Sequence, residues 1–342
     1  LREMLMRKIN GVPVEAHTDL SSLTGGEVLK WDSTNTLMAW EDQDSTGFVP
    51  WVFPGSNYGF TAGGSARTSV IEKFALASSA TAASWNNLSQ SIMIGAGQSS
   101  STHGFYSGGN VAPGDLSVNT IDKFSFTTSA SAVDHGDLSL ARQYIAGQSS
   151  SDSGFTVSGG STTTSPGDTI DKFAFSSNVT AADHGNLSVS RVQVAGHSSS
   201  DNGFTSGGLD SSSQTDVIDK FAYSSNTTAT DHGNLSVSRR TIAGTSSETH
   251  GFTSGGHNGS VWIDTIDKFS FASNTTAADH GGMSTNQFGQ AGHSSTDYGY
   301  VSGGESSGDI NVIERFSVSS NVTASDVGDL VTARNSVVGT QY

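Results

Sequence analysis

The sequence contains no cysteine, and only 14% of its residues carry a charge. The absence of cysteine excludes a disulfide framework and thiolate chemistry. Basic residues are scarce as well, since 16 Lys and Arg stand against 32 Asp and Glu, for a net charge of −16. Such a surface repels a phosphate backbone, so we expect no nucleic-acid partner. No apolar run approaches the roughly 18 residues of a membrane span, and residues 1–10 lack the apolar stretch of a signal peptide, so we expect no membrane insertion.

Glycine is abundant, with 41 residues among 342, and the hydrophobic fraction is 34%. Together these apolar residues suffice for a buried core. A weakly charged chain rich in Gly, Ser and Thr is typical of many short strands joined by tight turns.

Three motifs recur six times each, at intervals of 45 to 50 residues, which is typical of a repeat architecture. The first, Gly-Phe-x-x-Gly-Gly or a close variant, begins at Gly59, Gly104, Gly154, Gly203, Gly251 and Gly299. The second, Ile-Asp-Lys-Phe or a close variant, supplies Phe74, Phe124, Phe173, Phe221, Phe269 and Phe316. The third, Asp-His-Gly-x-Leu in its commonest form, ends with Leu88, Leu138, Leu187, Leu235, Met283 and Leu330.

Each repeat predicts four short strands without helical periodicity. In the unit after Arg191 we expect these strands at Val192–Ala195, Phe204–Ser206, Val217–Tyr223 and roughly Ala229–Leu235. The third strand carries apolar side chains on both faces, as expected of a sheet packed between two neighbours. The sequence therefore predicts an all-β fold: a six-bladed β-propeller of four-stranded blades, preceded by a short β or irregular N-terminal arm.

A seventh copy of the first strand of the repeat occurs at the C-terminus. Asn335–Gly339 matches Gln143–Gly147, whereas the N-terminal segment Phe48–Phe53 carries Pro50, which suits a sheet edge and not an inner strand. We therefore expect residues 335–340 to form the inner strand of the first blade. The expected domains are an arm over residues 1–46 and a propeller over residues 47–342.

The period, the Gly-Gly doublet, the aromatic residue on the following strand and a closing arginine resemble kelch repeats across residues 47–342. The closing arginines are Arg142, Arg191, Arg239 and Arg334. The resemblance implies four-stranded blades with the first strand of each unit innermost. Two departures, the lack of the usual outer-strand Trp and an Asp-Lys-Phe motif, indicate a divergent branch, similar to kelch-like structural proteins of marine bacteriophages.

The first 46 residues break the repeat. Leu20–Glu41 resembles short β-modules of phage tail and head fibres. Two interpretations stay open: a strand pair that packs on the propeller, or an attachment arm that docks it to other virion structural proteins.

Asp-His pairs recur in four of the six units, at residues 134–135, 183–184, 231–232 and 279–280. Carboxylate and imidazole groups can act as a catalytic base or ligate zinc. However, propeller symmetry keeps the pairs far apart, whereas metal ligands converge within about 2–2.5 Å of one point. Nothing in the serine-rich segments resembles a Gly-x-Ser-x-Gly elbow between a strand and a helix, since no helix is expected to carry one. We therefore expect no catalytic residue, no cofactor and no metal, and predict that the chain is not an enzyme.

The loop between the second and third strands of each unit varies in length and chemistry, and recognition usually resides in such loops on a rigid scaffold. The loops are Ser65–Ser69, Asn110–Asn119, Ser161–Asp168, Leu209–Asp216, His257–Asp264 and Glu305–Asn311. The candidate ligand-binding residues are Trp262, His257, Asn258, Asp210, Asp115, Asp168 and Glu305. Trp262 either stacks on a sugar ring or anchors a protein, or packs over its own blade.

These observations favour a virion structural or adhesion module that presents its variable loops to a host surface glycan or protein. It would reside in the virus particle after assembly in the host cytoplasm, with self-association left open. Two alternatives remain: an intracellular kelch-type scaffold for protein partners, and a propeller enzyme such as a glycan hydrolase or lyase.

Overall fold

The computed structural model describes residues 57–162 and 165–341, together with four short strands nearer the N-terminus. The chain divides into two units, Leu1–Val52 and Phe53–Tyr342, where the sequence analysis placed the boundary after residue 46. In the first unit two antiparallel pairs form, β1 (Lys8–Ile9) with β2 (Val12–Pro13) and β3 (Glu27–Asp32) with β4 (Leu37–Asp42). No helix occurs in either unit among the described residues.

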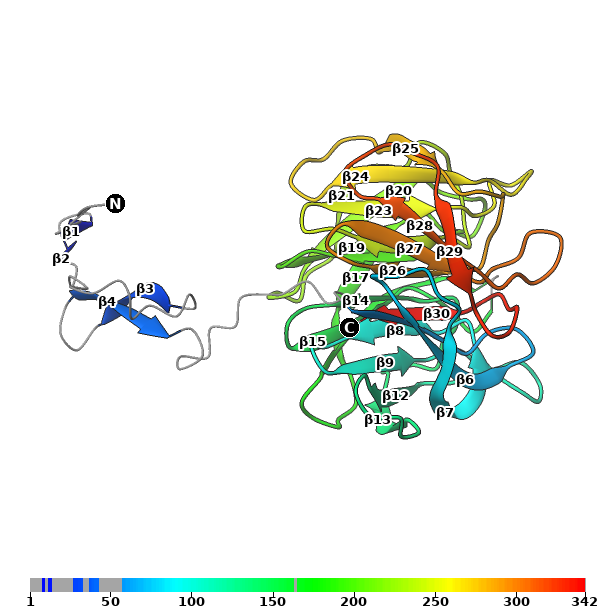
Figure 1. Cartoon of the computed structure of the whole chain (residues 1–342), viewed down its shortest axis with the longest axis horizontal. Helices are drawn as coiled ribbons and strands as arrows, with labels where there is room; N and C mark the ends of the chain where they lie inside the picture. Colours follow the sequence, from blue (N-terminus) through cyan, green and yellow to red (C-terminus); the bar gives the residue numbers. More distant parts are fainter. Residues whose placement is uncertain are drawn as a thin grey trace. The chain divides into compact units, whose positions relative to one another are not determined.

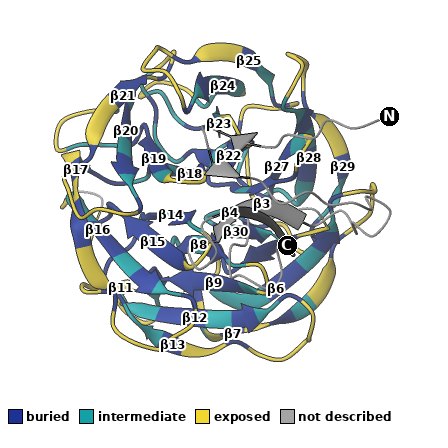
Figure 2. Cartoon of the chain, turned by 90° about the vertical axis from the view of Figure 1, so that its left-hand side faces the viewer, coloured by how far each residue is buried: buried dark blue, intermediate teal, exposed yellow. Residues whose placement is uncertain are grey.

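The second unit is a six-bladed β-propeller, as the repeats predict. Blades two to six are four-stranded antiparallel sheets whose strands follow chain order from the centre outwards. Figure 2 shows β8, β14, β18 and β22 near the centre of the ring and β13, β17, β21, β25 and β29 at its periphery.

The strands of blade two are β8 (Ala96–Ser99), β9 (His103–Ser107), β12 (Thr120–Ser125) and β13 (Val133–Asp137). Those of blade three are β14 (Ala146–Ser149), β15 (Ser153–Val157), β16 (Gly167–Ala174) and β17 (Ala182–Arg191). Those of blade four are β18 (Ala195–Ser198), β19 (Asn202–Ser206), β20 (Val217–Ala222) and β21 (Thr230–Asn234). Those of blade five are β22 (Ala243–Ser246), β23 (His250–Ser254), β24 (Thr265–Ser270) and β25 (Ala278–Gly282). Those of blade six are β26 (Ala291–Ser294), β27 (Tyr298–Ser302), β28 (Val312–Ser317) and β29 (Ser325–Asp329).

Blade one is assembled from both ends of the propeller. Its strands are β30 (Val338–Gln341), β5 (Tyr58–Ala62), β6 (Thr68–Ala75) and β7 (Ala83–Met93), extended at the edge by β10 (Asn110–Val111) and β11 (Leu116–Ser117). The C-terminal strand β30 pairs antiparallel with β5, with Val338 opposite Ala62. Figure 1 shows β30, in red, beside β8 of blade two. The ring therefore closes through hydrogen bonds between segments from opposite ends of the propeller.

The hydrophobic core lies between adjacent blades and not within one sheet. In four of the six blades the phenylalanine of the second strand stacks on an aromatic residue that directly follows the next blade's third strand. Opposite Phe252 and Tyr300 this position holds Val318 and Leu76. Phe155 and Tyr223 lie 4.5 Å apart at an interplanar angle of 21°, and Phe204 and Phe271 lie 4.5 Å apart at 19°. This arrangement is why both faces of that strand are apolar in the sequence.

In the two blades for which the sequence analysis gave a range, the first strand begins three residues later than expected. In blade one it spans Val338–Gln341, whereas the expected range was 335–340. In blade four it spans Ala195–Ser198, whereas the expected range was Val192–Ala195. The reason is a turn at Gln193, whose φ of 60° is left-handed and breaks the strand conformation. Only after this turn does the chain pair with β19, with Ala195 opposite Ser206.

Candidate binding face

The variable loops lie on one face of the propeller. Contacts between the loops of neighbouring blades are the evidence for this placement. Arg67 in the loop of blade one forms an ion pair with Asp115 in the loop of blade two. The Ser117 hydroxyl donates to the Ser161 carbonyl oxygen of the next loop at 3.2 Å. The Ser65 hydroxyl donates to the Asp309 carboxylate of blade six at 2.5 Å.

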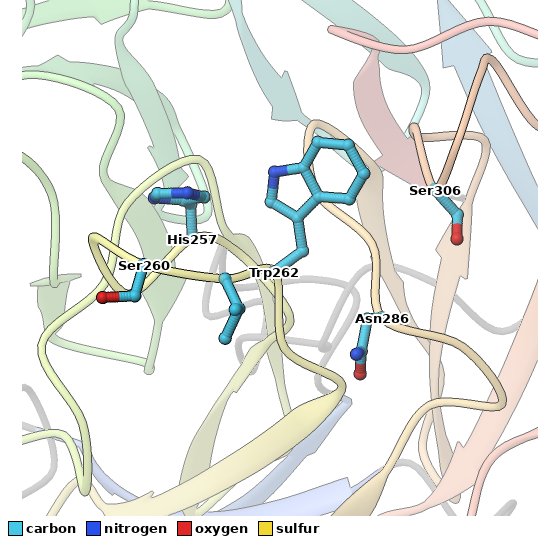
Figure 3. A pocket seen from close by; sticks show the side chains of 6 residues that line it. His257, Ser260, Trp262, Asn286 and Ser306 are labelled. Atoms are coloured by element: carbon cyan, nitrogen blue, oxygen red, sulfur yellow. The ribbon is translucent and has the colours of Figure 1, made fainter.

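A hollow of about 530 Å³ opens on this face beside the loop of blade five (Figure 3). Three segments build it: the loop itself, the connector from blade five to blade six, and the loop of blade six. Its lining residues are His257, Ser260, Val261, Trp262, Asn286 and Ser306. The two rings of His257 and Trp262 lie on the same side of their loop, with Asn286 and Ser306 across from them.

The loop that carries Trp262 is held by its own hydrogen bonds. His257 and Trp262 form an antiparallel bridge at its base. At its tip, the Asn258 side-chain oxygen accepts the N–H groups of Ser260 and Val261, at 3.0 and 2.9 Å. Such an Asx turn fixes the backbone without help from a ligand. The expected site residue Asn258 therefore shapes the loop and does not line the hollow.

The sequence analysis left two roles open for Trp262, contact with a ligand or packing on the protein, and the structure contains elements of both. Its ring packs on Phe288 of the following connector, with centroids 4.9 Å apart and an interplanar angle of 39°. The side chain is only half-buried and still lines the hollow. Packing on Phe288 therefore orients the indole, and the remaining surface is available for contact.

The lining of the hollow carries no full charge at neutral pH. The pKa of His257 is lowered by burial and, to a smaller extent, by the charge of Arg240, so its ring is neutral near pH 7. Two of the nearby carboxylates, Glu305 and Asp309 of the adjoining loop, each accept a hydrogen bond from the Asn335 amide, at 2.9 and 2.6 Å.

The other expected site residues do not meet at this hollow. The Asp210 carboxylate accepts the N–H groups of Ser212 and Ser213, and these bonds lower its pKa. Asp115 is the partner of Arg67, Asp168 is half-buried in β16, and Glu305 binds Asn335. Of the seven expected residues, the structure brings only His257 and Trp262 into one lining.

Sequence reasoning missed Asn286, Ser306 and the supporting ring of Phe288. A signal for two of them exists in the repeat, because the connector of blade five departs from the others. Asn286 takes the place of small residues such as Ser190 and Ser238, and Phe288 takes the place of Val192. Comparison of the connectors, and not only of the loops, would have indicated this region.

The Asp-His pairs connect adjacent blades. The His184 Nε2 atom lies 2.9 Å from the Ala222 carbonyl oxygen of the next blade, and its ring packs against Phe155 at 5.1 Å. The neighbouring Asp183 caps a turn by accepting the N–H of Gly185 at 3.1 Å. Within the described part of the chain, no three His, Asp or Glu side chains are grouped so as to hold a metal ion. No helix long and apolar enough to cross a membrane occurs in that part either.

The inner strands approach one another closely at the propeller axis. Each first strand carries a glycine at the same position, and a Cβ atom there would lie 2.1–2.3 Å from the carbonyl oxygen of the adjacent blade's glycine. These residues are Gly97, Gly147, Gly196, Gly244, Gly292 and Gly339. The cavities lined by these glycines measure only about 70 and 100 Å³, against about 530 Å³ for the hollow at the loops, which favours the loop face as the place of binding.

Comparison with known proteins supports the architecture alone. No family model matches the chain, and no curated protein matches it. Among solved structures it is similar to YjhT, with a TM-score of 0.63 and 10% sequence identity, over 81% of this chain and 99% of that one. At this identity the likeness shows that the chain shares the β-propeller fold.

Proposed function

We propose that this chain is a non-enzymatic binding module whose variable-loop face recognises a glycan or a protein on a host surface. The observation that carries the proposal is the hollow around Trp262, built by loops that differ from blade to blade on an otherwise repeated scaffold. An aromatic residue held by its neighbours and still open on one side is a common anchor for a ligand.

We further propose that the propeller is kelch-type and belongs to a virus particle, anchored to other virion proteins by residues 1–46. This part of the proposal rests on the resemblance of the repeats and of Leu20–Glu41 to phage structural proteins. Detection of the chain by mass spectrometry in purified virus particles would support it. Its absence from particles that contain all other structural proteins would contradict it.

The binding face is tested by exchanging a loop. Replacement of His257–Asp264 by the short loop Ser65–Ser69 removes Trp262 and His257 from the hollow. We expect attachment to the host surface to be lost and the thermal unfolding midpoint to stay close to that of the parent, because the loop lies outside the blade cores. The matched control exchanges Leu209–Asp216, the loop of blade four, in the same way. Retained attachment after exchange of all five longer loops would contradict the proposal.

A further inference from the structure

We infer that the hollow around Trp262 binds an uncharged pyranose ring, such as a neutral hexose unit of a glycan, and discriminates against acidic sugars. This inference rests on the proposed function and narrows its ligand to one chemical class. Three features of the site favour such a ligand: the indole surface, the polar groups around it and the charges nearby.

The indole provides a flat apolar platform held in place. Phe288 packs against it at 4.9 Å, and the bridge between His257 and Trp262 fixes the backbone that carries it. Aromatic rings of this kind give contact area at a small entropic cost, because few rotatable bonds need to be immobilised on binding. The C–H face of a pyranose matches such a platform, since it is the apolar side of an otherwise polar molecule.

The polar groups around the platform suit hydroxyl groups. The Gly259 N–H donates to His257 Nδ1 at 3.0 Å, so in the neutral ring the proton lies on Nε2, which makes no bond with any described residue. The Asn286 amide and the Ser260 and Ser306 hydroxyls also line the hollow. Together they offer donors and acceptors without a full charge, which is the pattern that sugar hydroxyls need.

The nearby charges disfavour an anionic ligand. Three carboxylates belong to the segments that form the hollow: Asp264 ends the loop of Trp262, and Glu305 and Asp309 belong to the loop of Ser306. One cation, Arg240, lies close enough to lower the pKa of His257. The excess of negative charge, within a chain of net charge −16, opposes a uronic or sialic acid more than a neutral sugar.

The test compares sugars that differ in one group. Methyl glucoside, galactoside and mannoside are titrated by calorimetry against the whole chain, beside the matching methyl uronides, in which a carboxylate replaces the C6 hydroxymethyl group. We expect at least one neutral member to bind, and to bind at least about tenfold more tightly than its uronide. Trp262→Ala should weaken that binding at least about tenfold, whereas Trp262→Tyr, which keeps an aromatic platform, should retain most of it. Leu116→Ala, an exposed apolar residue of the blade-two loop, is the control and should change nothing.

The outcomes separate this inference from the proposed function. Tighter binding of a uronide, binding that is insensitive to Trp262→Ala, or binding of none of the six sugars would overturn the neutral-sugar inference. The binding face itself would still stand if exchange of His257–Asp264 abolished host attachment. Conversely, neutral-sugar binding that Trp262→Ala abolishes would support the inference even if loop exchange left attachment unchanged, and the proposed function alone would then fail.

Discussion

The first glycine of each repeat is required by the aromatic residue that follows it in the unit. In blade four, Gly203 pairs with Phe221 across β19 and β20, and the ring of Phe221 lies over the glycine. A Cβ atom at Gly203 would lie 2.3 Å from Cζ of Phe221, and the other five units give 2.2–2.4 Å. The Gly-Phe-x-x-Gly-Gly and Ile-Asp-Lys-Phe motifs therefore reflect the same contact between a glycine and a phenylalanine ring, which forms once in each of the six blades.

The contact between Gly203 and Phe221 predicts how a methyl group added at the glycine changes the free energy of unfolding. Gly203→Ala should lower the free energy of unfolding by about 1–3 kcal/mol, because Phe221 is buried between two blades and cannot move aside without disturbing both. Urea denaturation measures the change. Gly282→Ala is the control, since its Cβ would meet only the end of the Asp264 side chain at 3.1 Å. Equal losses for the two variants would contradict this explanation.

At the scale of the element, the connectors between blades are fastened by buried ion pairs, but not all of them. The Arg191 Nη2 atom lies 2.8 Å from the Asp219 Oδ2 atom, and both side chains are fully buried. Equivalent pairs join Arg142 to Asp171, Arg239 to Asp267 and Arg334 to Glu72. In the two remaining connectors the arginine position holds Ile92 and Gln287, which leaves Asp122 and Glu314 without a guanidinium partner.

The unpaired carboxyl groups titrate differently from ordinary ones. Burial raises the pKa of Asp122, the nearby Asp134 raises it further, and the bond from the Ser89 N–H opposes the shift. Burial also raises the pKa of Glu314. A carboxyl with a raised pKa in the folded state contributes stability below its unfolded pKa and loses that contribution as the pH rises through the folded value. These two groups therefore disfavour the folded state at neutral pH.

Asparagine substitutions at equivalent positions should have opposite effects. Asp122→Asn keeps an acceptor for Ser89 and removes the buried charge, so we expect equal or greater stability than the parent at pH 7, with the difference vanishing near about pH 3.5. Asp219→Asn leaves the Arg191 charge unpaired in the core and should cost about 3–5 kcal/mol at pH 7. Denaturant titrations of both variants at the two pH values measure these changes. If Asp122→Asn lowered the free energy of unfolding at pH 7 as much as Asp219→Asn, the buried charge would not be what determines the stability at these positions.

At the scale of the whole molecule, stability depends on closing the ring. The strand β30 supplies the inner edge of blade one, and Arg334, just before it, donates to the Thr61 and Val70 carbonyl oxygens of the same blade. Val337 and Val338 are buried there. Blade one therefore has its inner strand from one end of the propeller and its other three main strands from the opposite end.

Deletion of residues 335–342 should destabilise the entire propeller, by at least about 3 kcal/mol, because it removes two buried valines and exposes the edge of β5. The thermal unfolding midpoint measures the loss, and the transition should remain single if the ring unfolds as a whole. Val331→Ser, at an exposed position in the same terminal region, serves as the control. An unchanged midpoint after the deletion would contradict the role of β30 in closure.

The sequence by itself determined the number of blades and the strands they contain, because every blade repeats the same contacts. Each blade needs a glycine opposite a phenylalanine ring and a third strand that is apolar on both faces. Because both features recur in all six units, the repeat is clear in the sequence. The first strand was misplaced by three residues, since the left-handed turn at Gln193 depends on a backbone conformation that a glycine marks in only one of the six connectors, at Gly289.

Only the tertiary structure decided which residues line the hollow. Trp262 and Asn286 belong to different segments of blade five and Ser306 belongs to blade six, so their proximity depends on how adjacent blades pack. The hollow depends on Trp262 and Asn286, which the other units do not share, whereas a repeat pattern reveals what is shared among units. In the sequence, Asp115 and Asp210 were as plausible as Trp262 as ligand-binding loop residues. In the structure, Asp115 forms an ion pair with Arg67, and Asp210 accepts backbone N–H groups of its own loop. The physical reason is that such partners come from local turns and neighbouring loops, which repeat spacing does not specify.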